Sequence, residues 1–77
     1  MNTVHDSGRV FECDYLNSIY IIGYNASESV KNACIYFANN TSILVNIENT
    51  SNALTIDVDK VLLHDIQVIM IANSCGN

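Results

Sequence analysis

Apolar and polar residues alternate along several short stretches of the chain, and a period of two is typical of β-strands that bury one face. The pattern predicts strands over residues 10–15, 19–24, 33–38, 43–48, 53–58 and 65–72. Clusters of Asn, Ser and Thr, which favour turns, separate several of these stretches. We therefore expect a mainly β fold, a small antiparallel sheet or barrel of about five to six short strands.

Residues 27–38 fit two different structures. A helix there would place four apolar residues on one face, namely Val30, Ala33, Cys34 and Phe37. A strand over 33–38 would instead lead into Asn39 and Asn40, a pair that tolerates the left-handed conformation of tight hairpins. We predict a short helical turn over 27–32 followed by a strand. The alternative is an α+β fold, in which one helix packs on an antiparallel sheet.

The spacing of the stretches also predicts which strands pair. Turn residues at 16–18 favour a hairpin of the first two strands, and the cluster at 49–52 favours an antiparallel hairpin of 43–48 with 53–58. Asp59 is expected to cap a single helical turn before the last strand.

The last predicted strand, 65–72, is apolar on both faces. One face carries Ile66, Val68 and Met70, and the other carries Ile69 and Ile71. If the first set fills the core, the second set would form an exposed apolar patch of the kind that marks an interaction site. Tyr20, Ile22 and Tyr24 share a second such face, and aromatic residues with a polar tip are enriched in interfaces. The predicted interface residues are Tyr20, Ile22, Tyr24, Ile69 and Ile71.

The length of 77 residues suggests one domain over 1–77, with flexible tails at 1–8 and 73–77. A domain of this size buries only about 60% of its unfolded surface, so it is marginally stable unless something is added to the core. Association with copies of itself is one such addition. We therefore expect a homo-oligomer.

The charge of the chain limits its partners. The net charge is −5, and the only strong bases are Arg9, Lys31 and Lys60. Nucleic-acid binding depends on Lys and Arg side chains that neutralise phosphates, so we expect no nucleic-acid partner. No apolar run approaches the roughly 20 residues that span a bilayer, so we expect no membrane association either.

The cysteines Cys13, Cys34 and Cys75 are odd in number and widely spaced, which does not suggest a disulfide framework. We expect Cys13 and Cys34 to be small core residues and Cys75 to be an exposed thiol. Together with the absence of a recognisable export signal, this favours a cytoplasmic protein, in the host cytoplasm if the gene belongs to a phage.

Candidate chemistry is sparse. His64 lies near Asp57, Asp59 and Asp65, but these ligands are too few and lack the glycine turn of a calcium loop, so a structural turn is the expected role. His5 falls in the predicted tail, and no glycine-rich phosphate loop is present. We expect no catalytic residue, no metal site, no cofactor and no enzymatic activity.

These observations favour a non-enzymatic, homo-oligomeric binding or inhibitory protein. Its abundant Asn and Ile suggest an AT-rich gene, and a phage or mobile element is a plausible source. Such a protein could block a host protein or sequester a small ligand. The alternative is an acidic adaptor or subunit that docks on a larger basic partner protein.

Overall fold

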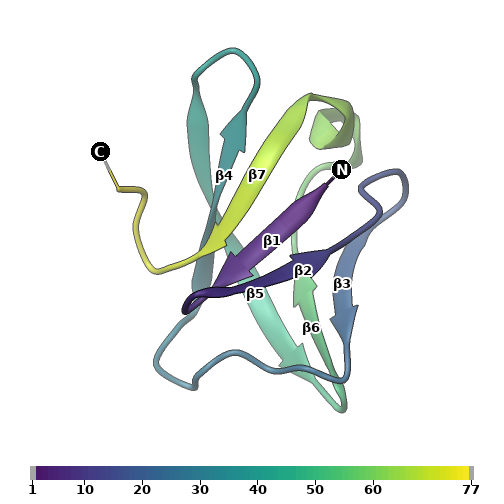
Figure 1. Cartoon of the computed structure of the whole chain (residues 1–77), viewed down its shortest axis with the longest axis vertical. Helices are drawn as coiled ribbons and strands as arrows, with labels where there is room; N and C mark the ends of the chain where they lie inside the picture. Colours follow the sequence, from purple (N-terminus) through teal and green to yellow (C-terminus); the bar gives the residue numbers. More distant parts are fainter. Residues whose placement is uncertain (1, 77) are drawn as a thin grey trace.

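The computed structural model describes residues 2–76, which form seven strands and one short 3-10 helix (Figure 1). In chain order these are β1 (Thr3–Asp6), β2 (Arg9–Glu12), β3 (Ile19–Ile22), β4 (Asn32–Phe37), β5 (Ser42–Thr50), β6 (Ala53–Ile56), η1 (Lys60–Asp65) and β7 (Ile66–Ile71).

The strands form one mixed sheet in the order β2-β1-β7-β4-β5-β6-β3, which curls until it is nearly a closed barrel. The pair β1–β7 is parallel and the other pairs are antiparallel. The mainly β prediction is confirmed, and the α+β alternative is wrong because the ambiguous stretch forms no helix and its second half forms β4. The helical turn predicted over 27–32 does not form. Residues 27–30 make a tight turn instead, in which the Val30 N–H donates to the Ser27 carbonyl at 3.0 Å.

Strand β5 joins the two halves of the barrel. Its residues 42–46 pair with β4, and its residues 47–50 pair with β6. Figure 1 shows β5 running from the β4 side of the molecule to the β6 side. Because the two ends of β5 pair with different strands, the sheet turns back on itself along β5. Its inner face then encloses the core.

The core is made of rows of β-branched residues that lie side by side across the strands. One row runs through Val4, Ile69, Ile35 and Ile43. Another runs through Ile19, Ile56 and Ile47. Val4, Ile35 and Ile69 are completely buried. Such side chains suit a pleated inner face, which explains why these short stretches form strands.

The prediction that Ile69 and Ile71 form an exposed face is wrong, because both lie in the core, with 0% and 9% of their surface exposed. The cause is an irregularity in the pairing of β4 with β7, where Phe37 lies opposite Ile66 but Tyr36 lies opposite Val68. The extra residue shifts the alternation by one position, so Ile66 faces inward with Ile69 and Ile71. The argument for an interface at these residues therefore loses its basis.

Residues 3–8 of the segment predicted as a flexible tail belong to the sheet and its first turn, and Met1 lies outside the described residues. β1 lies inside the sheet between β2 and β7, and it forms a hairpin with β2. Ser7 and Gly8 make the turn with φ of 51° and 84°, a combination typical of two-residue hairpin loops. Because β2 pairs with β1 and β3 pairs with β6, the hairpin predicted for β2 and β3 does not form.

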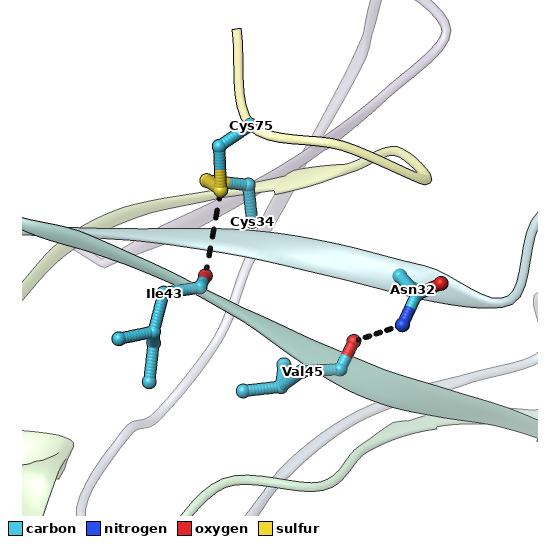
Figure 2. The surroundings of a disulfide bond; sticks show 5 residues. All are labelled: Asn32, Cys34, Ile43, Val45 and Cys75. Carbon is cyan, nitrogen blue, oxygen red and sulfur yellow. Dashed lines mark hydrogen bonds between the residues drawn. A yellow bond between two sulfur atoms is a disulfide. The ribbon is translucent and has the colours of Figure 1, made fainter.

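A disulfide joins Cys34 in β4 to Cys75, with 5.2 Å between the Cα atoms, so the predicted exposed thiol is wrong (Figure 2). Cys34 lies on the outer face of the sheet, and the chain after β7 folds back to cover it. Asn73 holds this segment further: its side chain accepts from the Lys31 N–H at 2.7 Å and donates to the Ser29 carbonyl at 2.9 Å. Within the segment predicted as a flexible tail over 73–77, Asn73 and Cys75 thus contact the sheet and the loop before β4, and Asn77 lies outside the described residues.

Other local predictions are confirmed. β5 and β6 form the expected antiparallel hairpin, and Asn40 adopts the left-handed conformation (φ 69°) in the turn between β4 and β5. The Asp59 side chain caps η1 by accepting from the Val61 N–H at 3.1 Å. Within residues 2–76, no helix has the length and apolar character needed to cross a membrane.

The disulfide should contribute substantially to stability, because it closes a loop with a sequence separation of 41 residues. Loop-closure entropy predicts that Cys75→Ser lowers the free energy of unfolding by about 4 kcal/mol. Urea denaturation would measure this, with Cys13→Ser as the control, since Cys13 is not in the disulfide. Equal denaturation midpoints for Cys75→Ser and the native chain would contradict the prediction.

Candidate functional site

Strand β3 presents two large apolar side chains to solvent. Tyr20 is 50% exposed and Ile22 is 72% exposed, whereas Ile19 and Ile21, which alternate with them, are buried in the core. Two of the predicted interface residues are therefore exposed on one strand. We call Tyr20 and Ile22 the β3 face.

The backbone of β3 is paired on one side only. The Gly23 N–H donates to the Asn52 carbonyl at 2.7 Å, so Gly23 and Asn52 are a hydrogen-bonded pair at the end of the β3–β6 ladder. Because such pairs alternate in antiparallel sheets, Ile19 and Ile21 also point their backbone groups at β6. The N–H and C=O groups of Tyr20 and Ile22 therefore point away from β6, towards the open edge.

The same reasoning applies to β2, which is the other end of the sheet. The Cys13 N–H donates to the Asn2 carbonyl at 3.1 Å, so Phe11 pairs with β1, and the backbone groups of Val10 and Glu12 point outward. Figure 1 shows β2 and β3 connected by a loop at one end of the barrel. We call the gap between their unpaired edges the seam.

The seam contains an open hollow of about 450 Å³. It is lined by Phe11, Glu12, Cys13, Asp14, Asn17, Ser18, Tyr20, Ile21 and Ile22. A second hollow of about 450 Å³ lies on the β6 side of β3, and Tyr20 lines both. β3 is therefore a ridge with open space on each side.

Side chains connect the two strands at the ends of the seam. At one end the Cys13 thiol lies 4.0 Å from the Tyr20 carbonyl. At the other end the Phe11 and Tyr24 rings are 4.6 Å apart between centroids, and the Arg9 guanidinium lies 5.0 Å from each centroid. These contacts hold β2 and β3 near each other without a backbone ladder.

Tyr24, a predicted interface residue that follows the end of β3, has a structural role. Its hydroxyl donates to the Asp6 carboxylate at 2.6 Å, and Asp6 is 5% exposed. The hydrogen bond to Asp6 is the main reason that the pKa of Tyr24 is raised, because ionisation would remove the donor and place two negative charges side by side. This bond ties β1 to the end of β3.

The thiol of Cys13 is poorly suited to nucleophilic chemistry. Burial raises its pKa, so little thiolate forms near neutral pH. Burial also raises the pKa of Tyr15, whose hydroxyl donates to the Thr3 carbonyl. Both groups line or support the loop between β2 and β3 as structural residues.

Carboxylates surround the β3 face on both sides. Glu12 and Asp14 line the seam, and Glu48 and Asp57 line the second hollow. All four residues are exposed. Glu48 lies two strands from Tyr20 in a row that runs through Thr55. The surface around the two apolar side chains is therefore acidic.

The other candidate residues lie elsewhere. Ile69 and Ile71 are in the core, and His64 is exposed at the end of η1. Asp57, Asp59 and Asp65 do not join it in a ligand set, since residues 2–76 contain no group of three potential metal ligands. His5 lies in β1, and its ring contacts the Thr3 hydroxyl at 3.3 Å.

Two exposed apolar residues, one on β2 and one in the loop before β3, were not predicted. Val10 is 57% exposed on β2, and Leu16 is 62% exposed in the loop before β3. The signal for Val10 was its position between the charged residues Arg9 and Glu12, since a strand that carries charges beside its apolar residues suits an exposed edge. Leu16 carries no comparable signal.

The chain was compared with protein-family models, with curated proteins and with solved structures, and none of them matches it.

The Tyr24–Asp6 hydrogen bond should be measurable as stability. Tyr24→Phe should lower the free energy of unfolding by about 1 kcal/mol near pH 7, which urea denaturation would detect. Because the folded pKa of Tyr24 lies above the unfolded value of 10.0, this stabilisation is complete below pH 10 and is lost at higher pH. The difference between the two proteins should therefore shrink above pH 10.

Tyr20→Phe is the matched control for this measurement, because the Tyr20 ring is half exposed and lies on the β3 face. It should leave the denaturation midpoint unchanged. Equal midpoints for Tyr24→Phe and the native chain at pH 7 would show that the hydrogen bond does not contribute to stability.

Proposed function

We propose that this chain is a non-enzymatic binding domain that docks on a basic surface of a partner protein through the β3 face. The observation that carries the proposal is the exposure of Tyr20 and Ile22 on a strand whose outer edge is unpaired. Large apolar side chains with a polar rim are typical of protein-binding surfaces, and tyrosine is enriched there.

The charge around the β3 face supports a basic partner over a second copy of the chain. Glu12, Asp14, Glu48 and Asp57 flank the face, and two copies meeting there would bring these carboxylates together. Like charges in a contact cost free energy, whereas a basic partner would be attracted and steered to the surface. The sequence led us to expect a homo-oligomer, but its argument from Ile69 and Ile71 no longer holds, and the acidic surroundings of the β3 face favour a monomer.

A protein partner is also better supported than a small ligand. Small molecules bind in concave sites lined mainly by apolar side chains. The hollows beside β3 are instead lined in part by carboxylates and by Asn17, Ser18 and Asn46. An inhibitory role towards a host protein, and a phage source, remain proposals that rest on composition alone.

We propose that the protein acts in an oxidising compartment and not in the cytoplasm. Disulfides persist outside the cytosol and are rare within it. The Cys34–Cys75 disulfide therefore supports an oxidising compartment, contrary to the cytoplasmic location expected from the sequence.

Differential capture would test the proposed surface. The native chain, a Tyr20→Ser/Ile22→Ser double variant and a Leu44→Ser control would each be immobilised and exposed to an extract of the organism that carries the gene. Leu44 is the matched control because it is 47% exposed on β5, which is not adjacent to β3. A basic protein that is retained by the native chain and the control, but is lost with the double variant, is the expected result.

Retention of the same proteins by all three chains would contradict a role for the β3 face. Light scattering on the purified native chain would show in addition whether a second copy occupies the face, and a monomer at micromolar concentration is expected. The retained partner should dissociate as salt is raised, because attraction between exposed charges is screened.

A further inference from the structure

The unpaired edge of β3 offers a backbone template as well as an apolar surface. Tyr20 and Ile22 are two positions apart on β3, and the backbone N–H and C=O groups of each point towards the seam. Exposed strand edges with such groups readily pair with another chain. A segment that adds to an edge in this way gains affinity from main-chain hydrogen bonds and specificity from alternate side chains.

β3 is short, but it lacks the charged residue, proline or bulge that commonly protects an edge strand. Its residues Ile19–Ile22 include no charged residue and no proline, and its pairing with β6 is regular over four residues. Natural edge strands are commonly protected by lysine, proline or a bulge. The opposite edge, β2, does carry charges, at Arg9 and Glu12. The contrast marks β3 as the edge that is suited to receive a strand.

We infer that the partner presents an extended segment that adds to β3 as an antiparallel strand, with basic and apolar residues alternating along it. This inference rests on the proposed function and specifies how the partner is recognised. The segment would accept from and donate to the backbone groups of Tyr20 and Ile22, and in doing so it would displace the Cys13 thiol from the Tyr20 carbonyl. Antiparallel pairing is favoured because its hydrogen bonds are better aligned than those of a parallel pair.

The side chains around the edge determine the chemistry of the segment. Residues directly opposite Tyr20 and Ile22 would project on the outer face of the sheet beside those side chains. A lysine or arginine there can lay its aliphatic stem along Tyr20 or Ile22 and direct its charge to Glu12 or Asp14, which line the same hollow. The intervening residues would face Phe11 and Ile21, which favours small apolar side chains.

A synthetic peptide can serve as the probe. Acetyl-Lys-Val-Lys-Val-Lys-Val-Lys-amide would be titrated into the isotope-labelled chain, and amide chemical shifts would be followed by NMR. Saturable shifts centred on Tyr20 and Ile22 are expected. A peptide methylated on the backbone nitrogen of each lysine keeps the charges and side chains but cannot donate to β3, so its affinity should fall about tenfold or more.

A pair of variants tests the same point from the protein side. Ile22→Pro removes the N–H group at the open edge without breaking the β3–β6 ladder, because Ile22 does not donate to β6. Ile22→Ala also loses the side chain but keeps this N–H group. Peptide affinity should fall further with Ile22→Pro than with Ile22→Ala, by about tenfold. The native NMR spectrum away from β3 would confirm that each variant is folded.

The outcomes separate this inference from the proposed function. Equal binding of the methylated and unmethylated peptides at β3 would overturn strand addition while leaving a basic docking surface in place. Binding by neither peptide at millimolar concentration would overturn strand addition by a basic segment. In that case, a basic protein that is captured by the native chain but not by the Tyr20→Ser/Ile22→Ser variant would still support the proposed function. Capture of the same proteins by both chains would contradict the proposed function, whatever the peptides do.

Discussion

The architecture depends on a sheet that curls almost far enough to close but leaves its two end strands unpaired. β5 makes the curl possible, because its nine residues pair with β4 at one end and with β6 at the other. The enclosed space is filled by isoleucine rows, so a chain of 77 residues obtains a core from one sheet. The consequence is the seam, where β2 and β3 approach each other without a backbone ladder.

Apart from the contact of the Cys13 thiol with the Tyr20 carbonyl, the side-chain contacts that hold the barrel together lie outside the β3 face. Asp6, Tyr24, Phe11 and Arg9 tie the hairpin of β1 and β2 to the end of β3. On the outer face of β4, the disulfide and Asn73 fix the chain after β7. Stability and binding are therefore assigned to different parts of the molecule, and substitutions at Tyr20 or Ile22 should change binding more than folding.

Much of the fold could be predicted from local patterns, because alternation and turn residues act over a few neighbours. The strands near 33–38 and 53–58 and the cap at Asp59 were found in this way. Three features could not be, because each depends on contacts distant in sequence: the parallel pairing of β1 with β7, the bulge that turns Ile69 inward, and the Cys34–Cys75 disulfide. At the site, alternation identified Tyr20 and Ile22 as one face, but their exposure depends on β3 being an end strand.

Amide hydrogen exchange along β3 tests the central claim, that this strand is paired on one side and open on the other. Ile19, Ile21 and Gly23 point their N–H groups at β6 and should exchange slowly. Tyr20 and Ile22 should exchange about tenfold faster or more, because their N–H groups face the seam. Equal protection of all five amides would contradict the account, since it would mean that the barrel is closed or that another chain already covers the edge.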